Sequence, residues 1–250
     1  MHECPSHPLV DWFAQPTFPA NVRAGFTTIR GGCSGGEYAA LNLGFHVHDD
    51  PQSVRANRHK LEHYLGQSLA WMTQVHATGI ARASAARKGR EGFLEVGKAD
   101  AIIVERGYAG AVMVADCVPL ILVEKSGERG GVVHVGRAGL DLAIAPKVLE
   151  ALGEVVAILG PSICGTCYEV PLSLAEEVGR RWPGSRSTTS AGTPGLDIAA
   201  GLEAQLRQYG VAEIHRVPVC TYESGEHYSH RRATHAGTGT GRFAGVLQIL

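Results

Sequence analysis

The sequence predicts a mixed α+β fold, because runs typical of β-strands outnumber those typical of helices and several of them follow one another directly. Glycine supplies 32 of the 250 residues, which favours many turns and close backbone approaches over long helices. The chain shows no internal repeat and no low-complexity linker. We therefore expect a single domain over residues 1–250, with an extended N-terminal segment at residues 1–20.

Seven runs rich in Val, Ile and Leu predict strands buried in the fold. Each run is bounded by Gly, Pro or a charged residue, as buried strands commonly are. The runs are Ala101–Glu105, Ala111–Ala115, Leu120–Glu124, Gly131–Val135, Glu154–Leu159, Ile214–Cys220 and Phe243–Leu250. Because the first four come in succession, the pattern favours layered mixed sheets over a strict alternation of strands and helices.

Two helices are predicted from their end signals and length. Asp50 offers an N-cap, Pro51 fits the first helical position and Gly66 offers a stop, so one helix is expected over Pro51–Leu65. Another is expected over Leu172–Trp182.

Two further segments have an apolar helical face. One helix is expected to end before Gly210. Its apolar face is formed by Leu196, Ala199, Leu202, Leu206 and Tyr209. The other segment, Leu140–Leu152, contains Pro146, and an interior proline costs a helix about 3 kcal/mol. This segment is therefore predicted either to kink or to begin its helix near Pro146.

The composition excludes several classes of function. The formal net charge is −1, so no sequence-independent attraction to nucleic acid or anionic lipid is expected. No apolar run approaches the ~18 residues of a membrane span, and the stretch Met1–Val10 lacks the apolar core of a signal peptide. We expect a cytoplasmic protein with reduced cysteines, small-molecule partners, no nucleic-acid or membrane partner, and a monomeric or weakly dimeric state.

Three distant residues with metal-ligating side chains stand at the ends of β-like runs. They are His76 in Thr73-Gln74-Val75-His76, Cys117 after the run that ends in Asp116, and His134 after Gly131-Val132-Val133. Each alone is also explained as a buried structural side chain. Together, two imidazoles and a thiolate suit zinc, and three protein ligands leave a fourth position for water or substrate. The set therefore indicates a catalytic metal site.

Two carboxylates are candidates for proton transfer near this site. Asp116 ends an apolar strand, where a carboxylate is costly to bury without a partner, so we expect it to bond to a ligand histidine. Glu169 follows the strand end at Gly160-Pro161, from which it is expected to point into the same cleft.

Other motifs allow a functional and a structural interpretation. The glycine-rich segment Thr28–Gly36 with Arg30, and the C-terminal arginines Arg231, Arg232 and Arg242, suit anion recognition, although exposed arginines are common on any surface. Cys164-Gly165-Thr166-Cys167 is a C-x-x-C, typical of a redox dithiol or half of a zinc site; no second such motif exists, which favours a structural interpretation. His46-Val47-His48 is a single H-x-H, too few for a cupredoxin-type multicopper oxidase.

Taken together, the ordered motifs resemble the YfiH family, also called the laccase-domain, polyphenol-oxidase or purine-nucleoside-phosphorylase family. The resemblance runs from about Phe26 to the C-terminus. The segments that carry it are Phe26–Gly32, Leu41–Val47 with Asp49–Pro51, Val54 with Asn57-Arg58, Thr73–His76, Ala115–Pro119, Gly160–Ile163 with Cys167–Val170, Cys220–Tyr222, Tyr228–Arg232 and Thr240–Arg242.

The resemblance implies a four-layer α/β/β/α fold, similar to a bacterial toxin deamidase that uses a Cys–His pair. It implies zinc held by His76, Cys117 and His134, with Cu²⁺ also chemically suited to such ligands. It further implies phosphorolysis of adenosine, inosine, guanosine or methylthioadenosine, and deamination of adenosine.

The departure from the family pattern that matters most lies in the motif of the second histidine; smaller ones are the extra residue Ile29 and a glycine-rich insertion between Arg232 and Thr240. Where the family has His-Ala-Gly-Trp-Arg-Gly, this chain has His134-Val135-Gly136-Arg137-Ala138-Gly139. The ligand histidine stays, but Arg137 stands at the Trp position and Ala138 at the Arg position. If that arginine binds phosphate, Arg137 has to reach in from the adjacent position.

The leading hypothesis is a zinc-dependent purine nucleoside enzyme. In it, Asp116 or Glu169 moves the proton, and substrate or phosphate is bound by a set of polar and cationic residues. That set is Arg30, Asn42, Gln74, Arg231, Arg232 and Arg242. The alternatives are a hydrolase or deamidase with Cys117 as nucleophile and His134 as base, a copper-dependent polyphenol oxidase, and a binder without activity.

Overall fold

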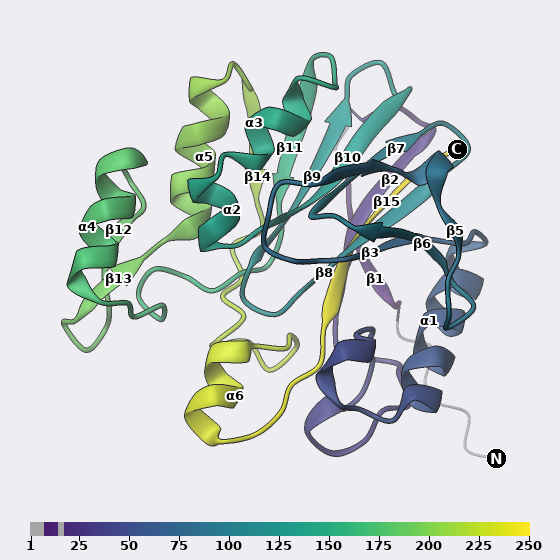
Figure 1. Ribbon diagram of the computed structural model, residues 1–250, viewed down its shortest axis with the longest axis horizontal. Helices are drawn as coiled ribbons and strands as arrows, with labels where there is room; N and C mark the ends of the chain where they lie inside the picture. Colours follow the sequence, from purple (N-terminus) through teal and green to yellow (C-terminus); the bar gives the residue numbers. More distant parts are fainter. Residues whose placement is uncertain (1–7, 15–17) are drawn as a thin grey trace.

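Two mixed β-sheets form the centre of the computed structural model, which describes residues 8–14 and 18–250 (Figure 1). The first has seven strands, in the spatial order β1 (Val10–Phe13), β2 (Val22–Thr27), β15 (Phe243–Ile249), β8 (Ala109–Val114), β3 (Ala70–Thr73), β6 (Leu94–Lys98) and β5 (Arg87–Lys88). The second has six, in the order β14 (Glu213–Arg216), β11 (Val155–Leu159), β9 (Val118–Glu124), β10 (Arg129–Val135), β7 (Ala101–Glu105) and β4 (Ile80–Arg82). Each sheet contains both parallel and antiparallel pairs.

The helices of the described residues are α1 (Pro51–Leu65), α2 (Arg137–Asp141), α3 (Ile144–Leu149), α4 (Leu172–Arg181), α5 (Ile198–Gln208) and α6 (His230–Ala236). Helix α1 covers the outer face of the first sheet, and α2, α3 and α5 cover that of the second. Three short 3₁₀ turns lie at Gly36–Tyr38, Phe45–Val47 and Ala83–Ala85, and a small ribbon of β12 (Arg186–Thr188) and β13 (Pro194–Leu196) lies beside α4. No helix within the described ranges is both long and apolar enough to span a bilayer.

Three apolar clusters separate four layers. Between the sheets, Ile121 of β9 shares a cluster with Leu247 of β15. Leu120, which neighbours Ile121 and so points to the opposite face, joins the cluster formed with α3 and α5. On the outer face of the first sheet, Leu61 of α1 belongs to a third cluster. Figure 1 shows the result, with α2, α3 and α5 on one side and α1 on the other. The predicted four-layer α/β/β/α fold is therefore confirmed.

The local predictions were accurate where end signals were strong. Helix α1 has the predicted bounds, because Asp50 accepts hydrogen bonds from the N–H groups of Gln52 and Ser53 and Gly66 closes the helix in a left-handed conformation. In the proline-containing segment, Ala143 takes φ 54 and separates α2 from α3. Pro146 thus lies in the first turn of a new helix, where a missing N–H is tolerated.

Two predicted segments are only partly regular. The strand expected over Ile214–Cys220 ends at Arg216, because Pro218 has no N–H to continue a ladder. In the N-terminal segment expected to be extended, Val10–Phe13 forms β1 and pairs with β2. Residues 1–7 and 15–17 of that segment lie outside the described residues.

The turn between β8 and β9 crosses from one sheet to the other. Strand β8 belongs to the first sheet and β9 to the second, and Ala115, Asp116 and Cys117 connect them. Strand β10 is the antiparallel neighbour of β9, and His134 pairs with Pro119 there. This crossing places Cys117 and His134 at the same end of the double layer.

Truncating Ile121 to alanine tests the core between the sheets. Its side chain is fully buried, so Ile121→Ala is expected to lower the free energy of unfolding by about 2–5 kcal/mol through lost burial and a cavity. Ile80→Ala in β4 is the matched control, because Ile80 is 39% exposed and its truncation should cost less than about 1 kcal/mol. Urea unfolding curves measure both. Equal losses in the two variants would contradict this layer assignment.

Candidate metal centre and its pocket

His76, Cys117 and His134 converge in the fold. Their ligand atoms all lie within 4.8 Å of one another. The two imidazole rings meet edge to face, with centroids 4.6 Å apart and planes at 75°. His134 is buried, Cys117 is half-buried and His76 is exposed, so the group is open to solvent on one side.

Unusual backbone conformations position two of these segments. His76 takes φ 58 in the loop after β3, and Asp116, directly before Cys117, takes φ 84. Left-handed conformations outside glycine are uncommon and cost ~1–3 kcal/mol, although His and Asp adopt them more readily than most residues. The surrounding structure therefore holds these two turns in place against their local preference.

Asp100 holds His134 and the His76 loop together. The Asp100 carboxylate is fully buried and lies 2.9 Å from Nδ1 of His134. It also accepts hydrogen bonds from the backbone N–H groups of Val75, His76 and Ala77. With Nδ1 engaged by a carboxylate, Nε2 is the nitrogen of His134 that remains for Cys117 or a metal, which is the arrangement that orients a histidine toward a metal. The sequence assigned this bond to Asp116, but Asp100 makes it.

The charges of the group shift its proton affinities in opposite directions. Burial by itself raises the pKa of the Cys117 thiol, but His134 and His76 outweigh burial and lower that pKa to about 6. Burial likewise lowers the pKa of His134, whereas the Cys117 thiolate and Asp100 raise it to about 9. The two shifts together favour the thiolate and the imidazolium over the neutral pair.

The donor set suits a metal ion. Zinc bonds of ~2.0–2.3 Å place tetrahedral ligands roughly 3.3–3.8 Å apart, so donors already within 4.8 Å need only small side-chain adjustments. Gly136 leaves room for this, since a Cβ there would lie 2.8 Å from Cys117 Sγ and 3.5 Å from His76 Cδ2. Three protein donors leave one position open, as in catalytic zinc sites.

A cavity of about 430 Å³ opens beside the three donors. Its lining combines the donor residues His76 and Cys117 with cationic, apolar and aromatic side chains. The other lining residues are Ala115, Asp116, Gly136, Arg137, Ala138, Ile163, Tyr168, Ile198, His230 and Arg231. The pocket therefore has a cationic part near the donors and an apolar wall.

Two arginines from different elements line this pocket. Arg137 is the first residue of α2, directly after Gly136, so the position that departs from the family pattern does face the cavity. Arg231 stands near the start of α6 with its guanidinium 4.8 Å from the Tyr168 ring centroid, and it donates a hydrogen bond to the carbonyl of Glu169.

Asp116, which lines the pocket, is hydrogen-bonded to α6 and to the loop before it. One carboxylate oxygen accepts from the Thr221 hydroxyl at 2.6 Å, and the other accepts from the backbone N–H of Arg231 at 2.6 Å. Asp116 is the only acidic residue among those that line the pocket. Glu169, which the sequence placed in the same cleft, lines a neighbouring pocket instead, and its carboxylate accepts from the Thr193 hydroxyl.

The other predicted phosphate-binding arginines do not line this pocket. The Arg30 side chain is exposed and pairs with Glu226. Arg232 stabilises the loop before α6, because its guanidinium donates hydrogen bonds to the carbonyls of Thr221, Tyr222, Ser224 and His227.

A hydrogen bond between Arg242 and Asn42 connects the segments that carry these two residues. Arg242 donates from its side chain to the carbonyls of Thr240 and Gly241, and its backbone N–H donates to Asn42 Oδ1. Asn42 is fully buried and also donates to Asp49.

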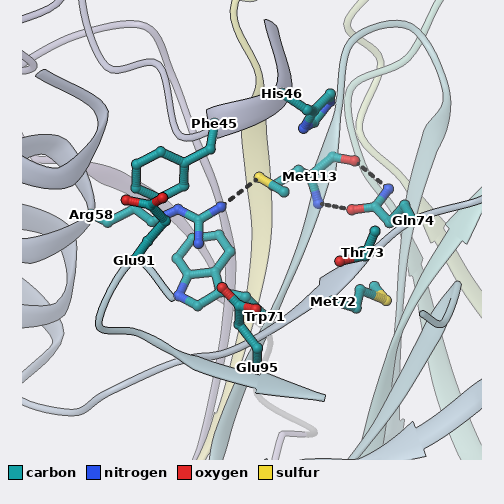
Figure 2. Close-up of a pocket in the computed structure, with 10 residues that line it drawn as sticks. All are labelled: Phe45, His46, Arg58, Trp71, Met72, Thr73, Gln74, Glu91, Glu95 and Met113. Atoms are coloured by element: carbon teal, nitrogen blue, oxygen red, sulfur yellow. Dashed lines mark hydrogen bonds between the residues drawn. The ribbon is translucent and has the colours of Figure 1, made fainter. Parts of the chain in front are cut away.

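Gln74 faces a different cavity, of about 300 Å³, shown in Figure 2. Its amide exchanges two hydrogen bonds with the backbone of Met113, at 2.7 and 2.9 Å. In the same cavity the Arg58 guanidinium lies against the rings of Trp71 and Phe45, at 4.0 and 4.6 Å from their centroids. Gln74 therefore joins β3 to β8 and so supports the loop that carries His76.

Sequence reasoning missed Asp100, Tyr168 and His230 as site residues. Asp100 offered a signal, since it is a carboxylate directly before the apolar run of β7, where burial demands partners. Tyr168 lay within a motif that was noted but given no role. His230 is the exposed first residue of α6 and precedes two arginines, and nothing local distinguishes it from a surface histidine.

The fold and the site define a class of protein, a four-layer α/β/β/α protein whose His–Cys–His group is compatible with metal binding at the edge of a cationic pocket. Residues 23–250 match the family described as multi-copper polyphenol oxidoreductase laccase, and the chain belongs to this family. The resemblance to YfiH proteins is confirmed.

Relatives and solved structures agree with this assignment. The chain is 41% identical to a purine nucleoside phosphorylase of Streptomyces coelicolor over 90% of this chain and 94% of the relative. It is 38% identical to a purine nucleoside phosphorylase of Mycobacterium tuberculosis, over 90% and 91%. A Neisseria meningitidis protein classed in DUF152 superposes with a TM-score of 0.86 at 30% identity, covering 97% of this chain and 99% of that one. YfiH of Bacillus licheniformis gives 0.81 at 26% identity, covering 92% and 93%.

Replacing Asp100 with asparagine tests its orienting role. Asp100→Asn removes the charge that fixes Nδ1 of His134, so metal affinity is expected to fall about 10–100-fold. Competition with a chromophoric chelator measures the change. Glu128→Gln, in an exposed pair with Arg106, is the control and should leave affinity unchanged. Equal affinity of Asp100→Asn and the wild type would contradict this role.

The reactivity of Cys117 in the metal-free protein should follow its lowered pKa. Alkylation by iodoacetamide, read for each peptide by mass spectrometry, is expected to rise with a midpoint near pH 6. In His134→Gln the charge that lowers the pKa is gone and burial remains, so the midpoint should move upward. Cys33, an exposed thiol outside the group, serves as an internal reference. A midpoint unaffected by His134→Gln would show that this histidine does not activate the thiol.

Proposed function

We propose that this chain is a zinc-dependent purine nucleoside phosphorylase that works in the pocket beside His76, Cys117 and His134. The observation that carries the proposal is that Arg137 and Arg231 line the same cavity as two of the donor residues, His76 and Cys117. The names of the relatives, purine nucleoside phosphorylases, support the reaction class.

The two arginines suit the inorganic co-substrate. Phosphate is a small dianion, and guanidinium groups bind it through short charge-assisted hydrogen bonds. In phosphorolysis a phosphate oxygen forms a bond to C1′ of the ribose while the bond from C1′ to the purine nitrogen breaks. The bonding electrons leave with the base, which takes up a proton. Holding phosphate in line with C1′ supplies most of what this reaction needs from a protein.

The apolar and aromatic lining of the pocket suits the purine. Ile163, Ile198 and Tyr168 offer apolar and aromatic surface, against which a flat heterocycle can pack. Because Arg231 lies over the Tyr168 ring, the base and phosphate regions adjoin. This adjacency matches a nucleoside, because the carbon that phosphate attacks, C1′, is bonded directly to the base.

The metal in this proposal would be held by His76, Cys117 and His134. Zinc there would act as a Lewis acid on a substrate oxygen, and the same ligands also suit Cu²⁺. Asp100 would keep Nε2 of His134 available to the metal, and Gly136 would keep the space beside Cys117 open.

Adenosine deamination is a second candidate activity, and the position of Asp116 favours it. In this reaction water bonds to C6 of the purine, the bond from C6 to the amino nitrogen breaks, and ammonia leaves with a proton from the attacking water. Asp116 is the carboxylate in the pocket that can carry that proton. The Glu169 carboxylate accepts a hydrogen bond from the Thr193 hydroxyl, so the proposal gives Glu169 no part in this proton transfer.

A cysteine hydrolase or deamidase is a third candidate. Such enzymes use a nucleophile, a base and a carboxylate that orients the base, and these roles would fall to Cys117, His134 and Asp100. The close approach of His76 favours the metal, because a Cys–His pair has no need of a second imidazole whereas a metal site does.

Product analysis with and without phosphate tests the proposal. The zinc-loaded protein should convert adenosine, inosine, guanosine or methylthioadenosine to free base and a ribose 1-phosphate, only when phosphate is present. Ammonia release from adenosine measures deamination separately. Absence of turnover in both assays, or base release independent of phosphate, would contradict phosphorolysis.

Variants of Arg137 locate the phosphate. Arg137→Ala should raise KM for phosphate at least about 10-fold and change KM for the nucleoside little, because hydrogen bonds to charged groups contribute ~1.5–3 kcal/mol. Arg137→Lys should recover part of the loss. Arg106→Ala, on an exposed pair, is the control. A rise in KM for the nucleoside alone would place Arg137 at the base instead.

A further inference from the structure

Four further metal-ligating side chains meet behind the pocket wall. Cys164 and Cys167 come from the loop between β11 and α4, and Cys220 and Glu223 come from the loop between β14 and α6. One donor atom from each lies within 4.8 Å of all the others. None of the four belongs to the His76, Cys117 and His134 group, so this is a separate cluster.

Two short hydrogen-bonded turns of the backbone build the cluster. Cys167 N–H donates to the carbonyl of Cys164, and Ser224 N–H donates to the carbonyl of Cys220. Each turn therefore presents two donors three residues apart on one side. A parallel β-bridge between Ser162 and Cys220 fixes the turns against each other.

The hydrogen bonds of the sulfur atoms connect the two loops. Cys164 N–H donates to Cys220 Sγ at 3.4 Å, which is a bond from backbone to sulfur across the two loops. The Cys167 thiol donates to Glu223 Oε1 at 3.3 Å. A divalent cation at the centre would replace the thiol protons and bind the resulting thiolates together with the carboxylate.

We propose that Cys164, Cys167, Cys220 and Glu223 form a closed, structural zinc site. Thiolate-rich sets with short C-x-x-C spacing select zinc among abundant divalent ions, and four protein ligands leave no open position for chemistry. Binding releases the thiol protons to solvent. The sequence does not show this site as a pair of C-x-x-C motifs, because its second pair of ligands, Cys220 and Glu223, has C-x-x-E spacing.

The surroundings of the cluster explain how this second zinc serves the fold. Arg232 donates to the carbonyls of Thr221, Tyr222 and Ser224, which places a positive charge beside a site that stays anionic after zinc binds. Thr221 also donates to Asp116 of the catalytic pocket. Tyr168, next to Cys167, lines that pocket. The zinc would therefore fix the two loops that form the pocket wall.

Metal stoichiometry of the full chain tests the site. The wild type, loaded with zinc and freed of loose metal by gel filtration, should hold two zinc ions per chain by plasma mass spectrometry. Cys117→Ala should hold one, and the double variant Cys164→Ser with Cys220→Ser should also hold one. Cys33→Ser, an exposed cysteine outside both groups, is the matched control and should keep two.

Cobalt distinguishes the two sites in folded protein. Thiolate-to-cobalt absorption scales with the number of sulfur ligands, so Co²⁺-loaded Cys117→Ala, with three thiolates, should absorb about threefold more strongly than the double variant, with one. If the double variant does not fold, Cys117→Ala alone tests the proposal. A bound cobalt ion with a strong thiolate band in this variant supports the second site. Failure of Cys117→Ala to bind any metal, or a disulfide among the cluster cysteines in freshly isolated protein, would overturn it. The nucleoside assays use the wild-type chain, so either result can be distinguished from a failure of the proposed function.

Discussion

The buried hydrogen bond between Asp100 and His134 is the interaction on which the site depends. A carboxylate with no exposed surface is stable only if every oxygen is satisfied, and here the imidazole and three backbone N–H groups do so. Because those N–H groups belong to the His76 loop, a single side chain positions two of the three donors. Loss of its charge would therefore disturb orientation, loop conformation and proton affinity together.

The third donor depends on the way in which the two sheets are connected. Cys117 lies in the crossing from β8 to β9, and Asp116 holds a left-handed conformation there because Thr221 and the start of α6 bond to its carboxylate. The same bonds bring Arg231 to the pocket. One turn thus links the metal donors, the cationic part of the cavity and the C-terminal helix, and the packed sheets supply the rigidity that the strained turn needs.

Much of the architecture was accessible from local signals. Continuous apolar runs gave the central strands, and the Asp50 cap with Gly66 gave α1 to the residue, because both signals act within one element. The strand expected to continue to Cys220 ends at Arg216. The hydrophobic pattern gave more weight to the apolar residues than to Pro218, which has no N–H for strand pairing. The group of His76, Cys117 and His134 was also proposed from side-chain chemistry and family resemblance.

What only the tertiary structure decided was which polar groups face one another. Asp100 rather than Asp116 meets His134, Arg137 and Arg231 rather than Arg30 line the cavity, and Glu223 completes the group around Cys164. The sequence by itself determined the layers and the residue types available for chemistry, because burial depends on patterns within a segment. Pairing between segments depends on strand order and crossings, and a carboxylate or guanidinium carries no local mark of the partner it will meet.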